Sequence, residues 1–154
     1  MLTKKEHNRC DGERVDETDR KIVEMLSEDA RIPFTEIAKC IGISEATVRK
    51  RVDSLEREGV IRKFTIDVDP RKLGYEAVAI LGLEVDPEHF LDAAECIARI
   101  SQTRWVATSS GDHMLMAEIW AKDAKGLHNV ISEQIERIEG VRRICPAIIH
   151  ERVK

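Results

Sequence analysis

Three segments within the first sixty residues carry apolar side chains at the spacing of one helix face. The first helix is expected to begin near Asp16, whose carboxylate suits an N-cap position, and the second near Thr35. The third is expected over 45–58, with Gly59 ending it. The stripes that should face a core are formed by Ile22, Met25 and Leu26 in the first segment and by Val48, Val52 and Leu55 in the third.

The stretch from 37 to 51 joins the second and third of these helices through a tight turn. Gly42 lies where such a turn needs a positive φ, and Ser44 is placed to cap the helix that follows. Ala38 is small at the point where two helices must cross closely. Together these spacings are typical of a helix-turn-helix unit, which places its second helix in the major groove of DNA.

From Val60 to Val68 the pattern changes to a period of two, which predicts a half-buried strand. Asp69, Pro70 and Gly74 then mark a connection between two domains. We therefore divide the chain into a mobile N-terminal arm at 1–14, a helix-turn-helix domain at 15–60, a linking strand and hinge at 61–74, and a second domain at 75–154.

The second domain has the pattern strand, helix, strand, strand, helix, strand. The expected strands are 77–85, 103–109, 114–121 and 141–153, and the expected helices are 88–100 and 124–138. This order predicts the ferredoxin-like βαββαβ arrangement, in which a four-stranded antiparallel sheet carries both helices on one face. With its winged-helix-like first domain, the chain belongs to the α+β class. The other sheet face would be bare in a monomer, so we expect it to meet a second copy.

The overall charge is acidic, formally −4, although the segment around the third helix is not. Within 44–63 the basic residues Arg49, Lys50, Arg51, Arg57, Arg62 and Lys63 outnumber Glu45, Asp53, Glu56 and Glu58. A local basic face is enough to meet phosphates. No apolar run reaches the ~20 residues of a membrane helix, and the first residues lack the apolar segment of a secretory signal. We therefore expect a cytoplasmic protein without a membrane partner.

Neither the cysteines nor the histidines form a chemical site in the sequence. The four cysteines contain no Cys-x-x-Cys pair, no two histidines have metal-binding helical spacing, and a glycine-rich phosphate loop and a nucleophile signature are both absent. We therefore expect no metal, no cofactor and no catalytic residue. Cys40, Cys96 and Cys145 are expected to be small core residues, and Trp105 and Trp120 to be core or interface aromatics.

The order of helix-turn-helix, strand and βαββαβ domain is similar to that of the Lrp/AsnC family of transcription regulators, from about residue 15 to the end. The segments that carry the resemblance are 15–22, 28–32, 43–61 and 67–74. The resemblance implies a DNA-binding regulator with its recognition helix within 43–61. It also implies that the second domain binds amino acids or related metabolites and assembles dimers, often into octamers.

The open side of the third helix holds the candidates for contact with DNA. Its N-terminal residues would enter the groove, where arginine pairs with guanine and alanine or threonine meets the thymine methyl, while neighbouring cations suit phosphates. Glu45 either favours the helix N-terminus electrostatically or accepts from a cytosine amine. The candidate DNA-binding residues are Ser44, Glu45, Ala46, Thr47, Arg49, Lys50, Arg51, Arg62 and Lys63. A solvated charged helix face is the alternative interpretation.

The hairpin loop of Ser109, Ser110, Gly111 and Asp112 corresponds to the effector-binding region of the family that the chain resembles. Glycine lets a ligand approach the backbone, and serine and aspartate can bond an amino or carboxylate group. The family commonly has an aspartate three residues after the glycine, and that position is Met114 here. Because these are also ordinary turn residues, an effector loop and a plain hairpin both remain open.

The sequence therefore predicts a sequence-specific transcriptional regulator that binds double-stranded DNA. We expect a homodimer or an octamer, modulated by assembly or by an amino-acid effector. One alternative is a small-molecule-sensing oligomer with weak or vestigial DNA binding, against which Arg49, Lys50 and Arg51 argue. A second alternative is an enzyme on the ferredoxin-like fold. No convergent set of acid, base and nucleophile in this sequence supports it.

Overall fold

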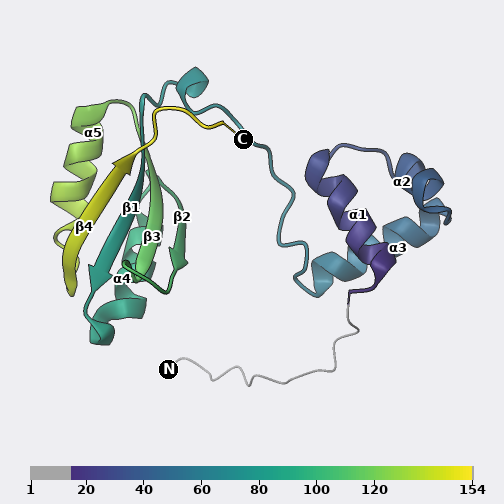
Figure 1. Ribbon diagram of the computed structural model, residues 1–154, viewed down its shortest axis with the longest axis horizontal. Helices are drawn as coiled ribbons and strands as arrows, with labels where there is room; N and C mark the ends of the chain where they lie inside the picture. The colour runs from purple at the N-terminus through teal and green to yellow at the C-terminus, as the bar shows by residue number, and fades with distance from the viewer. Residues whose placement is uncertain (1–14, 154) are drawn as a thin grey trace. The chain divides into compact units, whose positions relative to one another are not determined.

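The computed structural model describes residues 15–153, and the chain divides into two compact units, one up to Asp67 and one from Val68 (Figure 1). This division falls inside the segment predicted as linker and hinge, 61–74. The arm predicted at 1–14 lies outside the described residues. Within 15–153, no helix is both long and apolar enough to cross a membrane.

The first unit is built from α1 (Glu17–Glu28), α2 (Phe34–Ile41) and α3 (Glu45–Arg57), which confirms the three predicted helices. Its core is formed by Ile22, Leu26, Ile37, Ala38, Val48 and Val52. Burial of each larger apolar side chain contributes about 1.5–3 kcal/mol relative to exposure. The apolar stripes read from the sequence therefore hold the three helices together, and the opposite face of α3 is left in solvent.

The turn between α2 and α3 has the backbone that the sequence predicts. Gly42 has a φ of 80°, in the left-handed region, and its N–H donates to the carbonyl of Ala38 at 2.9 Å. A Cβ at this position would meet no atom within 4 Å, so the need for glycine comes from the backbone angle and not from crowding. The turn thus ends α2 and lets the chain change direction into α3.

The strand predicted over Val60 to Val68 is wrong. Residues 62–69 have no regular secondary structure, and the side chains of Phe64 and Ile66 are 46% and 77% exposed. A strand needs a neighbouring backbone to accept and donate its hydrogen bonds. Among the described residues, the strand pairs join only segments of the second unit. The apolar and polar residues do alternate in the sequence, but neither a backbone partner nor a buried face accompanies the alternation.

The second unit confirms the predicted βαββαβ order, with 3₁₀ turns at η1 (Arg71–Leu73) and η2 (Pro87–His89). Its elements are β1 (Ala77–Val85), α4 (Phe90–Arg99), β2 (Thr103–Thr108), β3 (Leu115–Ala121), α5 (Ala124–Asn129) and β4 (Val141–Ile148). The strands are antiparallel in the order β2-β3-β1-β4 (Figure 1). The last strand ends at Ile148, earlier than the predicted residue 153.

The helix expected over 124–138 consists of two kinds of turn. After α5 the chain continues into η3 (Val130–Ile135), whose wider π-helical turns carry a hydrogen bond from the Glu136 N–H to the Ile131 carbonyl at 2.8 Å. Val130 and Ile135 still reach the core. Apolar spacing predicted the buried face correctly, while the type of turn was outside what the pattern can distinguish.

Alternate residues of β1 face opposite sides of the sheet. Ala79, Leu81 and Leu83 are fully buried against α4, α5 and η3, where Ile97 and Ile135 join the same core. The alternate positions of the strands point to the side that carries no helix, which we call the open face. Its residues include Val78, Ile80 and Gly82 of β1, Met116, Glu118 and Trp120 of β3, Ala107 of β2, and Cys145 and Ala147 of β4.

The expectation that three cysteines are core residues is wrong. Cys40 and Cys96 are exposed and Cys145 is partly buried. Cys40 follows the buried residues Ile37 and Ala38 in the sequence, and Cys96 precedes the buried Ile97. Each of these cysteines nevertheless lies on the exposed side of its helix. Apolar neighbours in sequence were mistaken for neighbours in the core.

Candidate DNA interface and effector loop

The N-terminus of α3 is held by hydroxyl groups. The Ser44 side chain accepts from the Thr47 N–H at 3.1 Å, and the two hydroxyl oxygens lie 2.7 Å apart. Both residues are exposed. Since a hydroxyl can donate and accept at once, these two side chains retain capacity for a phosphate or base after capping the helix.

Arg49 is exposed, but its guanidinium already has partners. It donates to a Glu45 carboxylate oxygen at 2.9 Å, one helical turn earlier, and its Cζ lies 5.3 Å from the centre of the Phe34 ring. In the protein without DNA, this exposed ion pair offsets part of the negative charge of Glu45. Arg49 and Glu45 together form the polar surface near the start of α3.

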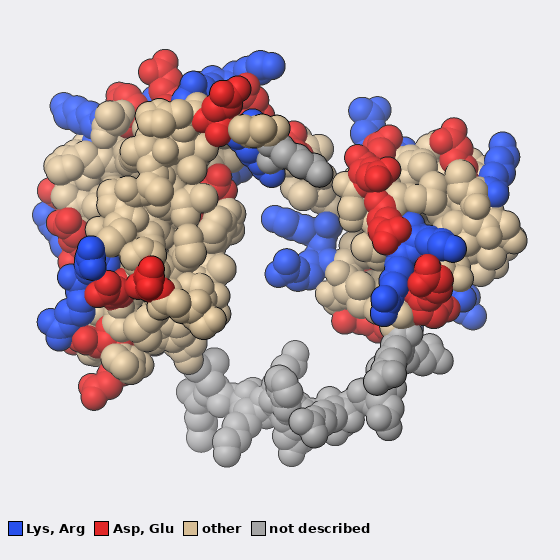
Figure 2. All heavy atoms as spheres, in the orientation of Figure 1, with Lys and Arg blue, Asp and Glu red and all other residues tan. Residues whose placement is uncertain are grey.

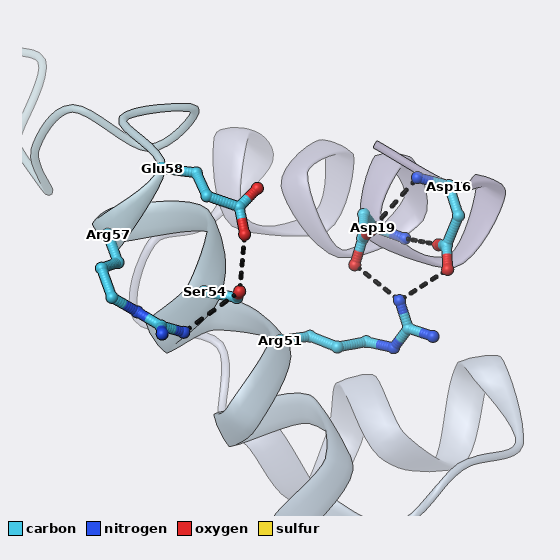
Figure 3. A network of polar contacts seen from close by, with 6 residues as sticks. All are labelled: Asp16, Asp19, Arg51, Ser54, Arg57 and Glu58. Atoms are coloured by element: carbon cyan, nitrogen blue, oxygen red, sulfur yellow. Dashed lines mark hydrogen bonds and ion pairs between the residues drawn. The ribbon is translucent and has the colours of Figure 1, made fainter. Parts of the chain in front are cut away.

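Arg51 lies on another side of the helix from Arg49. One of its guanidinium nitrogens donates to Asp16 at 2.7 Å and to Asp19 at 2.8 Å, so that α3 is tied to the start of α1 (Figure 3). The pKa of the Asp16 carboxyl is lowered, first by the Asp19 N–H and then by the hydrogen bond from Arg51. Arg51, predicted to contact a phosphate, is thus already paired with two carboxylates of its own unit.

The sequence predicted only one half of the capping box at the start of α1, the cap formed by Asp16. Asp16 accepts from the Asp19 N–H at 2.8 Å, and the Asp19 carboxylate accepts from the Asp16 N–H at 3.1 Å. Asp16 was expected as a cap, but its link to Arg51 was not. The two residues are 35 positions apart, so only the packing of α1 on α3 brings them together.

Three of the candidate cations have no ion pair with any described residue. They are Lys50 on α3 and Arg62 and Lys63 in the segment that follows it, and all three are exposed. Figure 2 shows basic and acidic side chains interspersed on the visible face of both units. On that face, phosphate contact would rest on particular cations and not on one broad basic patch.

The loop from 109 to 112 is exposed, and its first residue is used to close the hairpin. The Ser109 hydroxyl donates to the His113 carbonyl, and the Ser109 N–H donates to the Met114 carbonyl at 2.9 Å. Ser110, Gly111 and Asp112 are exposed and lie at the tip. Locally this is the geometry of a β-hairpin turn, with three residues left open for a ligand.

His113 anchors the end of this loop on the open face, which sequence analysis missed. Its imidazole occupies the space over Gly82 of β1, where a Cβ would lie 2.2 Å from the ring. The Met114 N–H donates to the Leu83 carbonyl at 3.0 Å. A glycine inside an apolar strand was the available signal, because such a glycine often marks close approach of another group.

Comparison with known proteins identifies both units. A family model described as the AsnC-type helix-turn-helix domain matches residues 15–56, and the model of the Lrp/AsnC ligand binding domain matches residues 78–154. The chain belongs to the Lrp/AsnC family. The family assignment by resemblance is confirmed, and this Lrp/AsnC member is a DNA-binding transcriptional regulator with a ligand-binding domain.

Relatives and solved structures match nearly the whole of this Lrp/AsnC chain. It is 52% identical over 140 residues to the HTH-type transcriptional regulator LrpA of Pyrococcus abyssi (strain GE5 / Orsay), covering 91% of this chain and 99% of that protein. It is 39% identical to LrpA1 of Halobacterium salinarum (strain ATCC 29341 / DSM 671 / R1), covering 89% and 96%. The crystal structure of PH0061 matches with a TM-score of 0.84 and 30% identity, covering 92% of this chain and 97% of that chain.

Proposed function

We propose that the regulator docks the N-terminal part of α3 in the major groove of double-stranded DNA. The observation that carries this is the exposed surface of α3 opposite its buried stripe, with Lys50 unpaired among the described residues and Arg62 and Lys63 following the helix. Ala46, Thr47 and Arg49 would face base edges, while Lys50, Arg62 and Lys63 would meet phosphates. Arg51 serves instead to hold α3 against α1.

The pair between Arg49 and Glu45 does not prevent Arg49 from reading a base. An exposed ion pair one helical turn apart is worth about 0.3–0.5 kcal/mol. A bidentate contact of arginine with guanine is worth about 1–3 kcal/mol of discrimination. The contact of Arg49 with guanine is therefore more favourable than its ion pair with Glu45. Glu45 then becomes available to accept from a cytosine amine or to remain at the positive end of the helix.

We propose further that the regulator works as a homodimer or a larger assembly of dimers formed through the second unit. The support is the open face, where Ile80 and Met116 are only partly buried and no helix covers the strands. A dimer would set two copies of α3 about 34–36 Å apart, one turn of DNA, or at a multiple of that spacing. Such a regulator works in the compartment that holds the DNA, which we propose is the cytoplasm.

An amino acid or related metabolite is the effector we propose for the loop of Ser109, Ser110, Gly111 and Asp112. The support is the match to a ligand-binding domain and the three exposed residues at the loop tip. Met114 is part of the hairpin closure and cannot pair with an amino group. Recognition of the ammonium group therefore falls to Asp112, the acidic residue of the loop.

The test is selection of genomic DNA fragments by the full-length protein, followed by gel shift on the selected site with and without a panel of amino acids. Arg49→Ala is expected to weaken specific binding by about 1–3 kcal/mol, with a smaller effect on unrelated DNA. Arg99→Ala is the matched control, because Arg99 makes the same kind of pair with Glu95 at 3.0 Å on the exposed side of α4. Equal affinities for Arg49→Ala and wild type would contradict the docking of α3, and failure to select any fragment would favour a sensor with vestigial DNA binding.

A further inference from the structure

A pocket of about 550 Å³ lies in the second unit, at the end of the sheet away from the loop of 109–112. Tyr75, just before β1, and Trp120, near the end of β3, line one part of it. Lys125 and Asn129 of α5 line another part. A volume of a few hundred Å³ is ordinary for a small-molecule site.

The pocket collects positive charge that the fold does not neutralise. Arg104, Lys122 and Lys125 line it, and none of the three forms an ion pair with a carboxylate in the part of the chain that the structure describes. The acidic residue of the lining is Asp123, whose carboxylate accepts from the Gly126 N–H at 2.6 Å and caps α5. Unpaired cations lining one pocket repel each other, and an anion between them relieves that repulsion.

The indole of Trp120 adds an unused donor. Trp120 is 8% exposed, and its Nε1 is buried with no hydrogen-bond partner among the described residues. Its ring has two neighbours, since the Arg104 guanidinium lies 4.1 Å from the ring centre and the centre of the Tyr75 ring lies 5.6 Å away. A buried N–H without a partner is uncommon in folded proteins and calls for an acceptor.

A hollow in the first unit differs, because an arginine and two carboxylates of its lining are paired with each other. A space of about 460 Å³ lies between α1 and α3, and its lining includes Arg51, Asp16 and Asp19. There the guanidinium donates to both carboxylates (Figure 3). In the pocket of the second unit, by comparison, Arg104, Lys122 and Lys125 have no carboxylate partner among the described residues.

We propose that the pocket of the second unit binds a small organic anion, with Arg104, Lys122 and Lys125 contacting its carboxylate or phosphate groups and the Trp120 N–H donating to one of its oxygens. The proposal is independent of whether the loop of 109–112 binds an amino acid. It gives the regulator a second small-molecule site. Tyr75 places that site directly after the segment of 68–74 through which the chain enters the domain.

The experiment uses the full-length protein with Trp105→Phe, so that Trp120 is its remaining tryptophan. Citrate, benzoate and inorganic phosphate are titrated separately at constant ionic strength while tryptophan fluorescence is recorded. A saturable change with at least one of these anions is expected, and comparison of citrate and benzoate with phosphate decides between carboxylate and phosphate recognition. Absence of a saturable change with all three at millimolar concentration would overturn the proposal.

Two double variants locate the bound anion. Lys122→Ala/Lys125→Ala is expected to weaken binding at least about tenfold, or about 1.4 kcal/mol, because it removes two charge-assisted contacts. Lys39→Ala/Lys72→Ala removes the same charge elsewhere and is expected to bind like the parent. If both variants lose affinity equally, the effect is general screening and the proposal fails.

A third variant separates this pocket from the loop. Ser110→Ala/Asp112→Ala is expected to leave anion binding unchanged. Loss of anion binding in that variant, with binding retained in Lys122→Ala/Lys125→Ala, would place the anion at the loop and overturn the proposed site. Neither result depends on DNA binding, so the outcome stands apart from the test of α3.

Discussion

At the residue scale, three neighbouring cations on α3 have three different environments. Arg49 is exposed and paired with Glu45, Lys50 is exposed without an ion pair among the described residues, and Arg51 is bound to Asp16 and Asp19. Their order along the helix explains the difference, because consecutive residues are turned by roughly 100° around its axis. The three residues are therefore expected to respond differently to substitution.

Lys50→Ala is expected to weaken binding to specific and unrelated DNA alike. It is also expected to lower the salt slope of the binding constant by about 1, because one phosphate contact is lost. Arg51→Gln is the comparison, and it is expected to leave that slope unchanged while lowering the midpoint of urea unfolding. Binding measured over a series of salt concentrations, together with urea unfolding, distinguishes the two. A reduced salt slope for Arg51→Gln would mean that Arg51 leaves the aspartates to contact DNA.

Asp16→Asn tests the same network through pH. The pKa of the Asp16 carboxyl is lowered below its ordinary value of 3.8 in the folded protein. The charged form is thus favoured by folding, so its contribution to stability is present above that ordinary pKa and is lost as pH falls through the lowered pKa. Asparagine keeps the N-cap acceptor but carries no charge. Urea unfolding is expected to show Asp16→Asn less stable than wild type at neutral pH, with the difference disappearing in acid; an unchanged difference in acid would argue against an ionic cause.

At the element scale, the helices were predictable because each has an apolar stripe and a local end signal. The Asp16 cap, the Ser44 cap and the left-handed Gly42 all act within a few residues of the chain. The segment after α3 cannot form its predicted strand from local interactions alone. Its alternating pattern was interpreted as a strand, but a strand is completed only by hydrogen bonds to another segment.

Gly42→Ala is expected to destabilise the first unit by about 1 kcal/mol. The reason is the left-handed backbone at this position, since open space surrounds the added methyl group. Gly42→Asn is the matched variant, because asparagine tolerates this conformation better. Urea unfolding followed by circular dichroism compares the two. Equal losses for alanine and asparagine would point to a contact of the side chain and not to the backbone angle.

At the scale of the whole molecule, the open face is the surface that the fold of one chain leaves unused. The helices cover the side of Ala79, Leu81 and Leu83, while Ile80 faces the other side among Glu118 and Ala147 in the register of the sheet. An apolar sheet face of this kind is typical of an interface between subunits. Assembly through it would also determine the distance between two DNA-binding units.

Ile80→Asp is expected to shift the full-length protein from dimer or larger assembly toward monomer, because it places a second carboxylate opposite Glu118 in the centre of the proposed interface. Leu91→Asp is the control, since Leu91 is an exposed apolar residue on α4. Light scattering at micromolar concentration measures the mass of each, and circular dichroism checks that each remains folded. A monomeric wild type, or equal dissociation of both variants, would contradict assembly through the open face.

The sequence alone determined the helix-turn-helix and the βαββαβ order, because apolar periodicity, caps and turn glycines act over a few residues. The family followed from the resemblance of particular segments to those of the Lrp/AsnC regulators. It also placed the candidate DNA-binding residues on one helix and the segments next to it, while the resemblance placed the candidate effector residues on one hairpin. Only the tertiary structure decided that Arg51 is bound by Asp16 and Asp19, that His113 lies over Gly82, and that the cations around Trp120 share one pocket. These features join residues from distant parts of the chain, and local patterns carry no information about which of them meet when the elements pack.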